Sequence, residues 1–263
     1  MKNKTEVTIL GCGSSLGVPR IDGYWGRANK NNSKNYRTRC SIFVKYKNIN
    51  VIIDTSPDIK YQILKNKIKN IDAVIYTHEH ADQTHGINEL RPFYWKNKKK
   101  IPLYASLKTI RSLKRSFTYL FIKKSLYYKP IFKEKIVNKK NFIIKKKNQS
   151  IFFSPLELIH GDIKSYGFLF NEIAYLPDCN KITLKSLNKL SDLKLLIIDC
   201  LKFKKHPTHL NFNSVIKYIN IIKPKKTILT NLHSDIDYNY IRNKLNKVSK
   251  KITPAYDNQK FFI

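Results

Sequence analysis

Two histidines and an aspartate stand close together in the first third of the chain. His78 and His80 are two residues apart, and Asp82 follows two residues later. Imidazole and carboxylate groups are ligands that zinc and other first-row metals take from protein loops. The apolar run 73–76 before His78 predicts a buried strand, and side chains at i and i+2 beyond it can point to one side. The spacing therefore predicts a metal site at the end of this strand.

Other residues of the same chemical types also follow strand-like segments. His160 ends the apolar run 152–159 and precedes a glycine, so we expect it to be a third ligand. Asp178 follows the strand-like run 173–177, where an aspartate is equally typical of a turn or a helix cap. Asp54 ends another apolar segment, and we interpret it as an acceptor that supports the metal-binding loop. Together these strand-end residues predict one metal-binding rim.

The composition limits the class of protein. The chain has 263 residues, of which 42% are hydrophobic, enough for a substantial core. It has no apolar run of about 18 residues, so we expect no membrane span or membrane partner. The N-terminal segment lacks the apolar stretch of a secretory signal, and the four cysteines include no C-x-x-C pair. These features predict a cytoplasmic, reduced protein.

The net charge of +33 has two interpretations. Lysine is abundant throughout and arginine is rare, a pattern typical of a compositional bias rather than of a specific nucleic-acid surface. In either case the surface potential favours phosphate-bearing ligands. Arg37 and Arg39 could bind a phosphate through their guanidinium groups, and exposure as ordinary surface arginines is an equally good interpretation.

The hydrophobic pattern alternates groups of short strands with helices. Strand-like runs occur at 8–11, 41–46, 51–54, 73–77, 151–158, 166–170, 173–176, 195–199 and 227–229. Helical periodicity occurs at 57–67, 107–117, 182–189, 213–222 and 236–248. Because no linker or repeat interrupts the chain, we expect one domain over residues 1–263, with two mixed sheets and outer helices.

Several motifs follow one another in an order that belongs to a known family. They lie at 77–82, 158–161, 175–178, 206–209 and 228–230, and the similarity extends from 8–14 to 254–257. The chain resembles the metallo-β-lactamase fold superfamily, in the phosphodiesterase branch that includes ribonuclease Z and phosphoribosyl cyclic phosphodiesterase. The resemblance implies an α+β fold, an αββα sandwich in which two mixed β-sheets pack face to face with helices outside.

The resemblance also assigns roles to the candidate residues. It implies a first metal ion held by His78, His80 and His160, and Asp178 as the bridge to a second ion. Asp82, the residue after it and a late histidine would hold the second ion. His209 matches the position of a proton donor to the leaving oxygen, or of a group that neutralises the developing oxyanion. The implied reaction is hydrolysis by a hydroxide between the ions.

The chain departs from the family pattern at the second metal position. Gln83 stands where the pattern H-x-H-x-D-H ends in histidine, and Asn231 stands where Leu-Thr-His ends in histidine. The ligands of the first position are all present. Losing two ligands of one position and none of the other indicates a coordinated change.

Three interpretations of this departure remain open. In the first, one zinc ion (Zn2+) occupies the intact position and Asp82 acts as the base in hydrolysis. In the second, Gln83 and Asn231 supply amide oxygens to a second ion such as Mn2+ or Mg2+. In the third, the metal is structural and the protein is a catalytically impaired module. We favour a hydrolase because the first position and His209 are intact.

The resemblance leaves the substrate open. The chain has no Gly/Pro-rich, lysine-studded insertion like the arm with which ribonuclease Z grips tRNA. We therefore expect a small cyclic phosphodiester as substrate, with a ribonuclease Z-like RNA-processing activity as an alternative. A non-catalytic, metal-binding module that binds RNA or protein is the alternative from a different class. The family resemblance also implies a homodimer as one possible oligomeric state.

Overall fold

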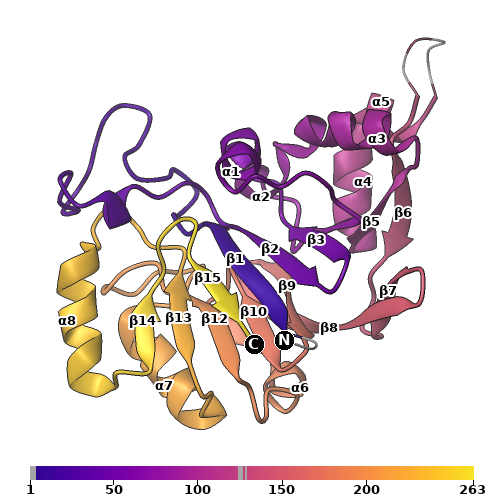
Figure 1. Cartoon of the computed structure of the whole chain (residues 1–263). Coiled ribbons are helices and arrows are strands. Elements are labelled where there is room, and N and C mark those ends of the chain that lie inside the picture. Colours follow the sequence, from indigo (N-terminus) through magenta and orange to yellow (C-terminus); the bar gives the residue numbers. More distant parts are fainter. Residues whose placement is uncertain (1–3, 124–126, 128) are drawn as a thin grey trace.

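Two β-sheets pack face to face between two layers of helices in the computed structural model, which describes residues 4–123, 127 and 129–263 (Figure 1). The first sheet has the strand order β15-β1-β2-β3-β4-β5-β6. Its strands are β1 (Thr5–Gly11), β2 (Ser41–Tyr46), β3 (Ile49–Ile53), β4 (Ala73–Ile75), β5 (Ile101–Ala105), β6 (Phe132–Ile136) and β15 (Lys260–Phe262). The carboxyl-terminal strand β15 therefore pairs with the amino-terminal strand β1.

The second sheet has the order β11-β8-β9-β10-β12-β13-β14, and β7 pairs with β8. Its strands are β7 (Phe142–Lys146), β8 (Gln149–His160), β9 (Ile163–Phe170), β10 (Ile173–Leu176), β11 (Lys181–Ile182), β12 (Leu195–Asp199), β13 (Thr227–Thr230) and β14 (Ile252–Pro254). Strands β10, β12, β13 and β14 are parallel. Parallel neighbours bring their carboxyl ends to the same edge of the sheet, where loops can meet.

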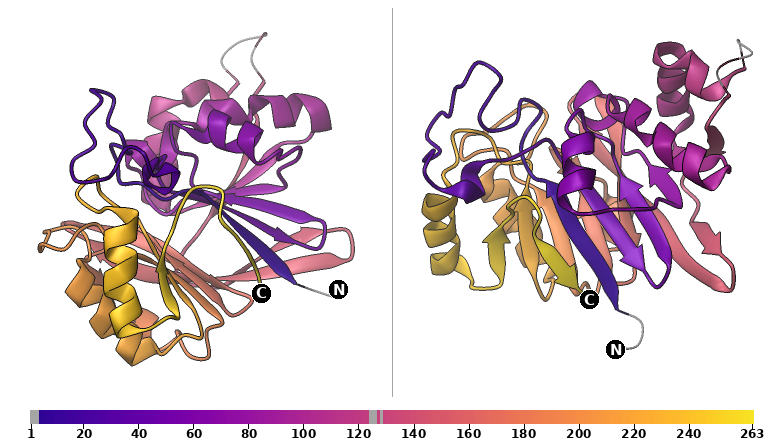
Figure 2. Two further views of the ribbon diagram at one scale, coloured as in Figure 1. Left: turned by 60° about the vertical axis from the view of Figure 1, so that its left-hand side comes forward. Right: turned by 45° about the horizontal axis from the view of Figure 1, so that its top comes forward.

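Helices cover the outer face of each sheet (Figure 2). Beside the first sheet lie α1 (Ile59–Lys65), α2 (Ala81–Thr84), α3 (Arg91–Asn97), α4 (Leu107–Ser116) and α5 (Thr118–Phe121), with the short 3-10 helix Ile87–Leu90. Beside the second lie α6 (Leu184–Leu187), α7 (Phe212–Ile222) and α8 (Tyr238–Val248). A further 3-10 turn covers Ser33–Asn35 in the long loop after β1. Within the described residues, none of the helices combines the length and apolar character needed to cross a bilayer.

The sandwich follows from alternating apolar side chains along the strands. Val51 and Ile53 of β3 point into the core between the sheets, whereas Ile52 points to the helix layer outside. On the second sheet, Ile197 of β12 faces the inner core and Ile198 faces α7 and α8. Because successive strand residues point to opposite faces, strands that are buried on both sides need nearly continuous apolar sequence.

The predicted αββα architecture is confirmed, and most predicted elements are present. Helix α4 and helix α7 match the predicted 107–117 and 213–222 within one residue at each end. The predicted helix 182–189 is shorter, because Lys181–Ile182 pairs with β8 and only Leu184–Leu187 is helical. The strands β5, β6, β7, β11, β14 and β15 were not predicted. The extent of the domain, residues 1–263, stays a prediction.

Candidate metal centre

Three imidazole rings meet at the edge of the sandwich, as the sequence predicts. His78 and His80 follow β4 of the first sheet, and His160 ends β8 of the second. The ring centroid of His80 lies 4.5 Å from that of His78, and both are 5.2 Å from that of His160. One ring nitrogen from each residue lies within 4.8 Å of the other two. The three rings can therefore reach one ion between the sheets.

A hydrogen-bonded relay orients His78. The backbone N–H and the hydroxyl of Thr77 donate to the Asp54 carboxylate at 2.9 and 3.0 Å. The Thr77 hydroxyl oxygen lies 3.0 Å from His78 Nδ1, which therefore donates its hydrogen to it. This leaves the lone pair of Nε2 free, and Nε2 is buried without a hydrogen-bond partner among the described residues. Asp54 thus supports the loop that carries His78 and His80; binding of a metal by this loop stays a prediction.

His160 has the same division of roles between its two ring nitrogens. Its Nδ1 donates to the backbone carbonyl of Thr208 at 2.7 Å, so Nε2 is free to bind a metal. Burial lowers the pKa of both His78 and His160, which keeps the rings neutral at physiological pH. Neutral imidazoles with one nitrogen held by the protein and the other unpaired are the form in which histidine binds zinc. These residues fit a transition-metal ion.

Asp178 lies beside this group but contacts other side chains. One of its oxygens lies within 4.8 Å of ring nitrogens of His160 and His209. Its Oδ2 accepts a hydrogen bond from Gln83 Nε2 at 2.9 Å, and its Oδ1 accepts one from Asn231 Nδ2 at 3.1 Å. Burial and the neighbouring charge of Asp82 raise the pKa of Asp178, whereas His209 and the hydrogen bond from Asn231 favour its charged form. The two amides that replace family histidines therefore both donate to the predicted bridging carboxylate.

His209 is held by a carboxylate that the sequence interpretation missed. Asp199, the last residue of β12, accepts from His209 Nδ1 through Oδ2 at 2.9 Å. Burial alone lowers the pKa of His209, but the charges of Asp199 and Asp178 outweigh it and raise the pKa to about 9. The Nδ1 contact leaves the Nε2–H of the protonated ring available to a substrate. The signal for Asp199 was a carboxylate closing a fully apolar strand, like Asp54.

Asp82, His85 and His233 lie outside both groups of candidate ligands. Asp82 is half-buried, and Gln83 Nε2 approaches its Oδ2 at 3.3 Å. The ring of His85 packs against Phe117 with centroids 5.4 Å apart. His233 Nδ1 accepts from the backbone N–H of Asp235 at 3.1 Å. The role of Asp82 as ligand or base stays a prediction, and neither other histidine takes the place of a missing ligand.

Both arginines considered for phosphate binding are engaged by the protein itself. Arg37 is only 1% exposed and donates to Asn35 Oδ1 and to the His233 carbonyl at 2.8 and 3.2 Å. Arg39 donates to Asp58 and to the Ser15 carbonyl, both at 2.9 Å. Their guanidinium groups fix the long loop after β1, and the interpretation of Arg37 as a phosphate ligand or a surface residue is wrong.

Three residues around the centre have left-handed backbone conformations. The φ angles are 65° at Asp54, 36° at Asp178 and 62° at Asn231. For residues other than glycine this conformation costs about 1–3 kcal/mol and persists where the surroundings fix it. Next to Asn231, the backbone of Gly13 bridges Leu232, and a Cβ at Gly13 would lie 2.8 Å from the Arg37 carbonyl oxygen. Tightly constrained loops therefore surround the centre.

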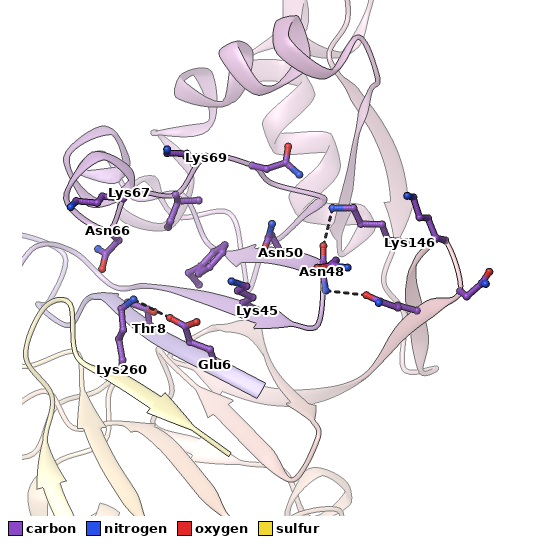
Figure 3. Close-up of a pocket in the computed structure, with 16 residues that line it drawn as sticks. Glu6, Thr8, Lys45, Asn48, Asn50, Asn66, Lys67, Lys69, Lys146 and Lys260 are labelled. Carbon is purple, nitrogen blue, oxygen red and sulfur yellow. Dashed lines mark hydrogen bonds and ion pairs between the residues drawn. The ribbon is translucent and has the colours of Figure 1, made fainter. Parts of the chain in front are cut away.

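A large hollow elsewhere on the surface is distinct from this centre. It has a volume of about 810 Å3 and is lined by six lysines, with Glu6 as its one acidic residue (Figure 3). Gln149, at the start of β8, lines it, whereas His160 ends the same strand. It therefore lies toward the opposite end of the strands and includes none of the candidate metal ligands.

Comparison with known proteins agrees with the fold. Residues 49–231 match the model of the beta-lactamase superfamily domain. The crystal structure of a diphosphatase from the PhnP family is 32% identical, with a TM-score of 0.89, and the match covers 99% of this chain and 97% of that one. The chain belongs to the metallo-β-lactamase fold superfamily.

More distant structures share the fold. Zinc-bound PqqB from Methylobacterium extorquens is 17% identical with a TM-score of 0.77, over 97% of this chain and 99% of that one. The short form of human tRNase Z is 16% identical with a TM-score of 0.69, over 97% and 98%. An octanoyltransferase of Porphyromonas gingivalis is 29% identical over 226 residues, which cover 85% of this chain but 45% of that protein. The chain thus spans less than half of this curated relative.

Proposed function

We propose that the protein is a metal-dependent hydrolase of phosphodiesters, with zinc bound by His78, His80 and His160. The observation that carries the proposal is the buried, unpartnered Nε2 of His78 beside two further imidazoles. The second metal position is altered, because Gln83 and Asn231 replace its histidines; Mn2+ or Mg2+ would be the ion expected there if amide oxygens bound one.

The residues around the centre can divide the proton transfers of hydrolysis. When bound, zinc lowers the pKa of a water molecule to about 7 and so supplies a nucleophile at neutral pH. Asp82 accepts a proton from the attacking water. His209, held by Asp199 through Nδ1 at 2.9 Å, donates the proton on Nε2 to the leaving oxygen. With the raised pKa of about 9, His209 carries that proton at neutral pH.

We propose a small cyclic phosphodiester as the substrate class. The net charge of +33 favours phosphate-bearing ligands over cationic ones. The similarity to a diphosphatase of the PhnP family supports chemistry at phosphate. A ribonuclease Z-like activity is the alternative within the same class and is supported by likeness of fold alone. A cytoplasmic location and a homodimer stay predictions.

The test is turnover of a chromogenic aryl phosphodiester and of nucleoside 2′,3′-cyclic phosphates by the zinc-loaded protein. We expect hydrolysis that a chelator abolishes, that zinc restores, and that His209→Ala reduces with the metal retained. A tRNA precursor added to the same series tests the ribonuclease Z-like alternative. Absence of turnover by protein that holds its metal would refute the hydrolase.

One observation favours a non-catalytic module as second candidate. The replacement of two metal ligands by Gln83 and Asn231, together with the charge of +33, is compatible with a structural metal in an RNA- or protein-binding protein. In that case no metal supports turnover, and RNA binding weakens steeply with salt. The two sets of results exclude one another.

A further inference from the structure

We propose that Gln83 and Asn231 hold Asp178 in place of a second metal ion, so that the centre binds one ion only. The residues around Asp178 therefore do not fit the second ion that the family implies. The inference concerns the metal content of the centre, and it uses the proposed function only for the identity of the first ion.

The amide groups occupy both oxygens of the carboxylate. Gln83 donates to Oδ2 at 2.9 Å from the first-sheet side, and Asn231 donates to Oδ1 at 3.1 Å from the loop after β13. All three side chains are buried, with exposures of 1%, 1% and 2% for Gln83, Asn231 and Asp178. Hydrogen bonds to a charged acceptor are stronger than those between neutral groups, and burial prevents water from replacing them.

The orientation of the two amide groups determines whether a cation can bind beside Asp178. The oxygens of ionised Asp178 accept but cannot donate, so each amide turns its NH2 group, not its carbonyl, toward that form of Asp178. The contacts agree, since Gln83 Oε1 is left buried without a partner while Nε2 meets the carboxylate. The NH2 hydrogens carry partial positive charge. A cation between them and Asp178 would compete for the same lone pairs and be repelled by the donors.

The other side of Asp178 is equally closed to a second ion. Asn231 Nδ2 lies 3.1 Å from His209 Nδ1, and that nitrogen donates its hydrogen to Asp199. His209 therefore presents no lone pair from Nδ1 toward Asp178. Neither His85 nor His233 belongs to a group of candidate ligands among the described residues. A second ion would find one carboxylate already shared between two donors, and beside it the His209 Nδ1 already bonded to Asp199.

The experiment counts metal ions in the full chain and in four variants. Each protein is saturated in turn with zinc, manganese and magnesium, dialysed to remove loosely held ions, and analysed by mass spectrometry for metal per chain. We expect about one zinc and no second ion of any kind in the unaltered protein. The double variant Gln83→His/Asn231→His should hold about two zinc ions, because both missing imidazoles return to their positions. Each single variant should hold one.

A matched control tests whether two histidines added at exposed positions are enough to bind a second ion. Asn97 on α3 and Asn239 on α8 are exposed and lie beside opposite sheets. The variant Asn97→His/Asn239→His should keep one zinc ion per chain. A second ion held by the unaltered protein would overturn the inference, as would a count of one in a folded double variant.

The metal count can be interpreted whether or not the protein proves to be a hydrolase. The unaltered protein is tested without any substitution, so a failure of the double variant to fold leaves the metal count decisive. One zinc per chain without phosphodiester turnover would refute the hydrolase and retain this inference. Turnover with two ions per chain would support the hydrolase and refute this inference.

Discussion

The two halves of the candidate centre satisfy their polar atoms in different ways. On the histidine side, His78 and His160 each have one ring nitrogen bonded to the protein and the other turned toward the centre. On the amide side, Gln83 and Asn231 donate to Asp178, and His209 donates to Asp199. The free imidazole nitrogen of His78 needs an external partner, whereas the donors on the amide side are paired with carboxylates; Gln83 Oε1 and Asp199 Oδ1 have no partner among the described residues.

The contrast shows how hydrogen bonds can take the place of an ion within one fold. A buried polar atom without a partner costs about 1–3 kcal/mol, so bare imidazole nitrogens favour an ion between them. Where an amide reaches the carboxylate instead, the hydrogen bonds satisfy the anion without a metal. The substitutions therefore alter the requirement for an ion on one side and leave it unchanged on the other.

The largest effect should follow removal of a ligand on the histidine side. His160→Ala removes one of three imidazoles, so we expect metal content to fall from about one ion per chain to near zero. Metal-dependent turnover should fall by more than the about 10- to 100-fold loss seen for groups that only support a ligand. Metal analysis and turnover of the same sample check this. Retention of a full metal ion would place the site elsewhere.

A large effect without metal loss should follow a change at His209. His209→Ala removes the proposed proton donor, and turnover should fall by about 100- to 10,000-fold while one zinc ion is retained. Because the pKa of His209 is raised to about 9, the acid form is lost as pH rises through that value, and turnover should fall there. Asp199→Asn should move this fall to lower pH. An unchanged alkaline profile in Asp199→Asn would contradict the role of the pair.

An intermediate effect should follow loss of the relay behind His78. Thr77→Val keeps the shape of the side chain but removes the hydroxyl between Asp54 and His78 Nδ1. We expect zinc affinity to fall by about 10- to 100-fold, measured by competition with a chromogenic chelator. Thr77→Ser restores the hydroxyl and should restore affinity. Equal affinities in the valine and serine variants would show that the relay does not matter.

The smallest effect should follow removal of a histidine outside both halves. His85→Ala should leave the metal count unchanged and alter the free energy of unfolding by no more than about 0.5 kcal/mol, as for other exposed positions. Chemical denaturation and metal analysis measure both quantities. A loss of metal in this variant would extend the centre beyond the two halves.

Sequence reasoning predicted the residues that directly follow strongly apolar strands. His78, His160 and Asp178 were found because each ends a segment whose period and composition predict a buried strand. The strands β14 and β15 were missed because each is only three residues long and forms by pairing with a distant segment. The local hydrophobic pattern of a short segment does not show with which distant segment it pairs.

The side-chain contacts within the centre could not be predicted from the sequence for a related reason. Gln83 and Asn231 could be recognised as departures from a pattern, but the direction of their amides depends on Asp178, which belongs to a third loop. The pairing of Asp199 with His209 likewise depends on how the loop between them returns to the end of β12. Side-chain orientation between separate loops follows only from the assembled fold.

The centre takes His78 and His80 from one sheet and His160 from the other, so a bound ion also acts as a cross-link through the sandwich. An ion that binds the folded chain alone raises its resistance to unfolding by about 2.7 kcal/mol at a free concentration 100 times the dissociation constant. The supply of that ion would then govern how long each copy survives thermal opening and proteolysis. Cells starved of the ion would lose the folded protein itself.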